Sequence, residues 1–190
     1  MITALLFQTA LAAPPGYTEA KRDNDCIIYK GPAESDGVIP IYTDCHWPEV
    51  SPEKLQQVQY DWAGHAKVFT TVRTSVVKKT EGEKSLVHQV HALSGVSDRE
   101  VEIWMWRQAV DGGFQYNWKS DGPMASPAKG NVATARHEGY WRITKHKDGG
   151  TRAEYMLIYD PGGSVPGFLI RWFQTSGTVT TTEELRAAGK

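Results

Sequence analysis

The segment 160–166, with the sequence DPGGSVP, separates a long series of strand-like runs from the last helical pattern of the chain. Gly162 and Gly163 allow the backbone to reverse out of the preceding strand, because glycine adopts positive φ angles without a steric cost. Pro166 has the φ angle of a first helical turn. The apolar residues that follow form a dense stripe: Phe168, Leu169, Trp172 and Phe173. We therefore predict that a final helix begins near Val165.

Upstream of this segment, six runs rich in β-branched and aromatic residues follow one another between short turns that contain glycine, aspartate or glutamate. The runs cover residues 70–79, 85–93, 100–110, 114–119, 132–146 and 151–159. Consecutive strands joined by tight turns pair antiparallel, whereas parallel strands need long crossover connections. The sequence therefore predicts an antiparallel meander.

The first part of the chain predicts two more strands and a helix. Residues 26–30 and 38–45 are β-rich and flank the turn sequence GPAESDG. Ser51 and Pro52 suit the N-cap and first position of a helix, whose end is expected within residues 64–69. The 190 residues thus predict a single α+β domain. Its curved antiparallel sheet has a concave face that only the final helix can cover.

The two cysteines, Cys26 and Cys45, both fall in the first predicted hairpin. A symmetric fold about Ser35 and Asp36 places them directly opposite each other, at a separation that a disulfide requires. We predict a Cys26–Cys45 disulfide, which is typical of an oxidising compartment. The alternative is two free thiols in half-buried strands.

Residues 1–13 are expected to be a secretory signal peptide. The apolar stretch Ile2 to Ala12 is too short to span a bilayer, and it closes on the small-x-small pattern Ala10-Leu11-Ala12. No lysine or arginine precedes it, so a frayed or docked N-terminal helix is the alternative. If cleavage occurs, the mature periplasmic or secreted domain covers residues 14–190 and begins near Ala13.

The charge of the chain disfavours nucleic acid as a partner. Its 21 basic and 22 acidic side chains are interspersed and give a formal net charge of −1. A nucleic-acid surface needs a concentrated positive field, because phosphate contacts supply most of the affinity.

Several spaced motifs resemble those of the START family of lipid-transfer domains. Residues 96–101 (VSDREV) resemble the beginning of a central strand in that family. Residues 129–132 (KGNV), followed by 139–143 (GYWRI), resemble another strand start. The segment 160–166 is similar to the family's D-x-x-G-x-x-P passage into the last helix. The resemblance covers roughly residues 26–190.

The resemblance implies a helix-grip fold of the Bet v 1-like superfamily, in which the sheet wraps a long C-terminal helix and encloses a hydrophobic cavity. It implies a secreted bacterial protein that carries a lipid, a sterol-like molecule or an isoprenoid without catalysis and without a cofactor. A monomer with transient membrane contact is expected.

The candidate ligand-binding residues come from strand alternation and from the last helix. Alternation in residues 101–108 places Met105 and Arg107 on one face of a strand. The family's sterol carriers have an arginine and an acidic residue on neighbouring strands, and these positions correspond to Met105 and Gln89 here, which puts a conventional sterol site in doubt. The full set is Gln89, His91, Ile103, Met105, Arg107, Tyr116, Tyr140, Phe168, Leu169 and Trp172.

Arg107 has two interpretations. It is either a displaced polar anchor for a carboxylate or phosphate, or a rim arginine paired with an acid such as Glu154. Ordinary core packing explains the apolar residues of the last helix equally well.

Catalytic and metal sites are not expected. The stretch around Ser164 lacks the closing glycine of a nucleophile elbow, and the phosphate-loop, dinucleotide and zinc-protease motifs are missing from the sequence. His88 and His91 are three residues apart, which places them on opposite faces of a strand.

Two other functions stay open. A polyketide cyclase or aromatase would use the same cavity, with His91, Arg107, Tyr116 and Tyr140 as candidate acids or bases. A protein-binding module would use an apolar convex face around Trp104 and Trp106.

Overall fold

The computed structural model describes residues 13–92, 95–167, 170 and 173–190. Residues 1–12 of the expected signal peptide therefore lie outside the described residues. The same holds for three residues predicted in the last helix, Phe168, Leu169 and Trp172.

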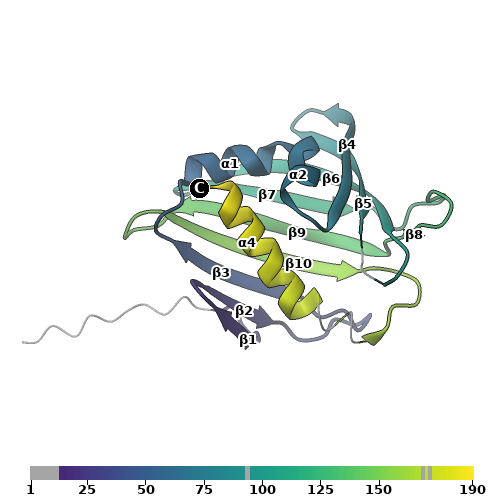
Figure 1. Ribbon diagram of the computed structural model, residues 1–190, viewed down its shortest axis with the longest axis horizontal. Helices are drawn as coiled ribbons and strands as arrows, with labels where there is room; N and C mark the ends of the chain where they lie inside the picture. Colours follow the sequence, from purple (N-terminus) through teal and green to yellow (C-terminus); the bar gives the residue numbers. More distant parts are fainter. Residues whose placement is uncertain (1–12, 93–94, 168–169, 171–172) are drawn as a thin grey trace, which may run out of the picture.

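One curved antiparallel sheet dominates the fold (Figure 1). Its path runs β1-β2-β3-β10-β9-β7-β6-β5-β4, and β8 pairs in parallel with β6. The strands are β1 Thr18–Asp23, β2 Cys26–Lys30, β3 Ile41–Trp47, β4 Val72–Glu81, β5 Lys84–His91, β6 Arg99–Val110, β7 Gly113–Ser120, β8 Val132–Ala133, β9 Arg136–Lys145 and β10 Thr151–Asp160. The predicted antiparallel meander and α+β class are confirmed.

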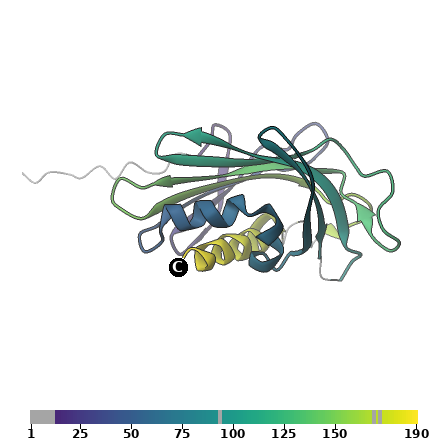
Figure 2. The ribbon, with the colours of Figure 1, turned by 90° about the horizontal axis from the view of Figure 1, so that it is seen from above.

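The helices lie together on the concave side of the sheet, as the view from above shows (Figure 2). They are α1 Pro52–Tyr60, the 3-10 turn η1 Trp62–Gly64, α2 His65–Val68, the π-helical turn η2 Phe173–Gly177 and α4 Thr178–Ala188. As predicted, Ser51 is the N-cap of α1, and its hydroxyl accepts a hydrogen bond from the Lys54 amide at 3.3 Å. None of the helices in the described part of the chain is both long and apolar enough to cross a membrane.

The first hairpin has the predicted register. Cys26 is paired with Cys45 across β2 and β3, and a disulfide joins them with a Cα–Cα distance of 4.1 Å. Both residues belong to the hydrophobic core, which fixes β2 against the main sheet.

Two parts of the strand prediction differ from the structure. β1 was not expected, because its sequence TEAKRD lacks an apolar alternation; it is an edge strand paired only with β2. The run 132–146 is divided into β8 and β9, because Ala133 ends its pairing with β6 and Ala135 donates to the Asp160 carbonyl.

The segment 160–166 is held by the strand that begins at Arg99. This arginine is 2% exposed and donates to the carbonyls of Pro161 at 3.2 Å and Gly162 at 3.3 Å. Gly162 has φ +68°, and a Cβ there would lie 2.4 Å from the Ala133 carbonyl oxygen. The motifs 96–101, 129–132 and 160–166 therefore have a structural role where the last strand leaves the sheet, whereas 139–143 pairs along the middle of β10.

Candidate functional site

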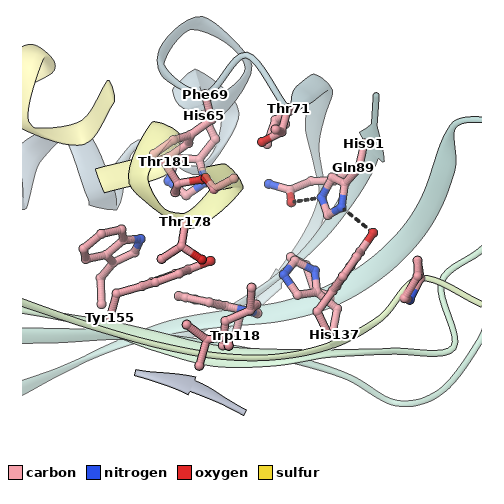
Figure 3. A pocket seen from close by; sticks show the side chains of 18 of the residues that line it. His65, Phe69, Thr71, Gln89, His91, Trp118, His137, Tyr155, Thr178 and Thr181 are labelled. Carbon is pink, nitrogen blue, oxygen red and sulfur yellow. Dashed lines mark hydrogen bonds between the residues drawn. The ribbon is translucent and has the colours of Figure 1, made fainter. Parts of the chain in front are cut away.

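A cavity of about 150 Å³ lies between the concave face of the sheet and the helices. Its apolar wall comes from four neighbouring strands. The wall side chains are Ile103 and Met105 of β6, Trp118 of β7, Trp141 of β9, and Tyr155 and Leu157 of β10. On the opposite side, His65 and Phe69 and the α4 residues Thr178 and Thr181 face the cavity (Figure 3). Sheet and helices thus enclose a space that neither could form alone.

One side of the cavity carries a directed chain of hydrogen bonds through His91. The Ser75 hydroxyl donates to the Trp62 carbonyl at 2.6 Å, so its oxygen accepts from the Gln89 amide nitrogen at 3.0 Å. The Gln89 oxygen then faces His91 Nε2 at 3.0 Å, which makes this nitrogen the donor. His91 Nδ1 is left to accept from the Tyr159 hydroxyl at 3.5 Å. The chain is satisfied by a neutral His91 (Figure 3).

His137 and Trp118 lie beside this chain and have unused hydrogen-bonding capacity. The His137 ring centroid lies 5.0 Å from that of His91, 5.1 Å from Tyr159 and 5.9 Å from Trp118. His137 Nδ1 and Trp118 Nε1 are buried and have no hydrogen-bond partner among the described residues. The Nε2 of Gln59, on the helical wall, is in the same condition. Buried polar atoms without a partner are uncommon and destabilising.

The titratable groups of the cavity are all held in their neutral forms. Burial lowers the pKa of His65 and of His91 to about 4 each. Burial, reinforced by the neighbouring His91, lowers the pKa of His137 well below its usual value. Burial raises the pKa of Tyr159 to about 12. Since no Asp, Glu, Lys or Arg stands among the described lining residues, this described part of the wall carries no formal charge at neutral pH.

Four of the residues predicted to contact a ligand line this cavity: Gln89, His91, Ile103 and Met105. Met105 and Gln89 lie on different strands, β6 and β5, and both face the cavity. Phe168, Leu169 and Trp172 lie outside the described residues.

Arg107 and Tyr116 were assigned to the correct face but lie beyond the cavity. The Arg107 guanidinium stacks between the rings of Tyr60 and Phe114, 4.3 Å and 4.4 Å from their centroids. Tyr116, opposite Arg107 in the register, is fully buried against Trp62. Because α1 and η1 cover this end of the concave face, Tyr116 is packed beneath these helices, whereas the exposed Arg107 lies at their edge against Tyr60 and Phe114.

The other predictions for this region also need correction. Tyr140 points to the opposite side of β9 from Trp141, and the Arg142 guanidinium lies 5.3 Å from its ring centroid. Glu154 is not the partner of Arg107, because it accepts from Tyr42 at 2.6 Å. The four candidate acids and bases of a cyclase therefore do not converge on one cavity.

The predicted apolar convex face is partly covered by lysines. The ammonium groups of Lys79 and Lys84 lie 5.1 Å and 4.9 Å from the ring centroids of Trp104 and Trp106. Trp104 also donates to the Asp121 carboxylate at 3.0 Å.

Sequence reasoning missed His137 and Tyr159. The two residues are direct partners in the β9–β10 register. Alternation along β9 places His137 on the face of Trp141 and Ile143, and this signal could have found it. The pairing of β9 with β10 then adds Tyr159.

The sequence and the structure were compared with those of known proteins. No protein-family model matches the sequence. An uncharacterized protein of Pseudomonas aeruginosa is 24% identical over 138 residues, which are 72% of this chain and 68% of that protein. A STAR-related lipid transfer protein from Xanthomonas axonopodis is similar in structure with a TM-score of 0.78, at 18% identity, over 90% of this chain and 97% of that chain. This chain has the START-type helix-grip fold.

Two further START-type or helix-grip structures extend the comparison. Human StAR-related lipid transfer protein 5 has a TM-score of 0.76 at 12% identity, over 93% of this chain and 88% of that chain. The Zhui aromatase/cyclase from a Streptomyces species has a TM-score of 0.53 at 11% identity, over 80% of this chain and 92% of that chain. The START-like motifs of the sequence thus correctly indicated the fold, which is shared by proteins with different functions.

Proposed function

We propose that this START-type protein is a non-enzymatic carrier that encloses one hydrophobic small molecule. The observation that carries the proposal is the cavity between sheet and helices, whose strand wall is largely apolar and aromatic and which carries the hydrogen-bonded pair Gln89 and His91 on one side. Binding would remove apolar ligand surface from water, and a few polar contacts would set the orientation.

The proposal requires the cavity to expand around its ligand. Its volume of about 150 Å³ is below the roughly 300–1,000 Å³ of most small-molecule pockets. The lining includes Gly177, at the junction between the π-helical turn η2 and α4. Irregular helical turns of this kind are frequent at functional hinges. A shift of the chain at this junction would enlarge the space under α4.

Native mass spectrometry of the purified protein, followed by uptake from a lipid panel, tests this function. Met105→Trp fills the cavity, whereas Met105→Leu conserves its volume and serves as the matched control. We expect bound lipid in the wild type and in Met105→Leu, and at least a tenfold loss in Met105→Trp, with unchanged far-ultraviolet circular dichroism. Absence of bound lipid and of uptake in the wild type would contradict the proposal.

The pKa values in the cavity support a carrier more than a cyclase-like enzyme. A general acid or base works best with a pKa near the operating pH. His91, with a pKa of about 4, and Tyr159, with a pKa of about 12, are both far from neutrality in opposite directions. An enzyme would need a bound ligand that shifts the pKa of His91 upward and that of Tyr159 downward, toward neutrality. It would also show turnover that His91→Gln abolishes while ligand binding persists.

We further propose that the protein is exported and acts as a monomer with transient membrane contact. The Cys26–Cys45 disulfide supports an oxidising compartment, and the START-type structure from a bacterium is compatible with it. Cell fractionation and N-terminal sequencing test export, with a mature start near Ala13 as the expected result. Light scattering and transfer between vesicles test the other two statements.

A further inference from the structure

The described part of the cavity wall offers hydrogen bonds but no counter-charge. Its described residues include no Asp, Glu, Lys or Arg, and its histidines are neutral. Of the guanidiniums nearby, Arg99 is engaged by the carbonyls of Pro161 and Gly162, and Arg136 is paired with Glu34 and Glu138. An ionised phosphate, sulfate or carboxylate placed in this cavity would lose its hydration without gaining a partner of opposite charge among the described residues.

The unpartnered polar atoms of the wall are suited to a hydrogen bond with a ligand oxygen. The indole nitrogen of Trp118 and the amide nitrogen of Gln59 are donors only, and His137 Nδ1 can donate or accept according to its tautomer. Trp118 and His137 are ring neighbours at the end of the Tyr159–His91–Gln89 chain. Because that chain already consumes the hydrogen-bonding capacity of His91 on both nitrogens, the unused capacity beside it belongs to His137 and Trp118, with Gln59 on the helical wall.

We propose that the ligand is an apolar molecule with an uncharged oxygen function, a hydroxyl or a carbonyl, that lies against His137 and Trp118. This inference rests on the proposed carrier function and narrows it to neutral lipids. A hydroxyl or carbonyl oxygen accepts from the Trp118 indole, and a hydroxyl can also donate to His137. Lipids whose only polar group is ionised would meet no counter-charge among the described residues of the wall.

Four probes with one alkyl chain separate the contributions of oxygen and charge. Hexadecanol, 2-hexadecanone, hexadecyl sulfate and hexadecane are titrated into delipidated protein at neutral pH, below the micelle concentration of the sulfate, and the dissociation constants are measured by native mass spectrometry and calorimetry. We expect the alcohol and the ketone to bind at least about tenfold more tightly than both the sulfate and the hydrocarbon. The sulfate stays ionised at this pH, so its result reports the cost of charge.

A charge placed in the wall should reverse the preference. Met105→Lys adds an ammonium group to the apolar wall, and Met105→Leu is the matched control. We expect Met105→Lys to tighten binding of hexadecyl sulfate at least about tenfold relative to Met105→Leu, without tightening that of hexadecanol. The wild-type titrations decide the question if this variant does not fold.

Two results would overturn the inference while leaving the carrier function in place: hexadecyl sulfate that binds the wild type as tightly as hexadecanol, or hexadecane that does so. If none of the probes binds and no lipid accompanies the purified protein, the carrier function fails and this inference fails with it.

Discussion

The concave and convex faces of β3, β10 and β9 hold polar side chains in different ways. On the convex face, Asp44 is fully buried, and Arg152 donates to its two oxygens at 3.0 Å and 2.7 Å. Glu154 accepts from Tyr42, and Arg142 lies 3.5 Å from it. On the concave face, the same strands present only neutral groups to the cavity.

This difference shows on which face of the sheet charged side chains are buried. Burial raises the pKa of Asp44, and the Arg152 guanidinium opposes that effect by pairing with it. A buried charge is tolerated when a partner of opposite charge is built beside it. The cavity wall contains no such pair among its described residues, so its polar groups are neutral. The sheet thus separates a charged convex layer from a concave layer whose described cavity residues are neutral.

Breaking the convex pair should have the largest effect. In Arg152→Leu the buried Asp44 carboxylate loses its charge partner, and the free energy of unfolding should fall by about 3 kcal/mol. Denaturant titration measures this change. The double variant Asp44→Leu/Arg152→Leu is the control, because it leaves no unpaired charge and should recover part of the loss. Equal losses in the two variants would contradict this account.

Acid should charge the neutral face and destabilise the protein. The folded-state pKa of His91, about 4, lies below the unfolded value near 6.5, so the unfolded chain binds more protons between these values. Stability is therefore unaffected above pH 6.5 and falls as the pH decreases toward 4. At pH 4.5 the loss is about 2 to 3 kcal/mol for this histidine, and His65 should lose a similar amount.

Urea titrations at pH 7.5 and pH 4.5 measure this loss. His91→Gln removes one titrating group, so the difference between the two pH values should shrink by the contribution of His91. An unchanged difference would mean that His91 does not titrate as its burial predicts.

The smallest effect is expected from removing an unpartnered polar atom of the cavity. His137→Phe deletes the buried Nδ1, so the free energy of unfolding of the ligand-free protein should rise by about 1 kcal/mol or less. The same change should weaken hexadecanol binding about tenfold. Tyr140→Phe, outside the cavity, is the control and should change neither quantity. If His137→Phe binds hexadecanol as the wild type does, His137 does not contact the head group.

Local patterns in the sequence predicted the elements well where one face is apolar. The α1 start followed from Ser51 and Pro52, and the disulfide followed from the hairpin register. β1 escaped prediction because an exposed edge strand has no apolar face to produce alternation. The site was predicted in part, since alternation along one strand identifies a face but not which stretch of it remains uncovered.

By itself the sequence determined which side chains share a face, because the two-residue period of a strand is a local property. It thereby placed Gln89, His91, Ile103 and Met105 on the cavity side. Only the tertiary structure decided that Arg107 and Tyr116 lie beyond the cavity, and that His137 and Tyr159 meet beside His91. These outcomes depend on strand register and helix position, which bring together residues far apart in the chain and which no local pattern encodes.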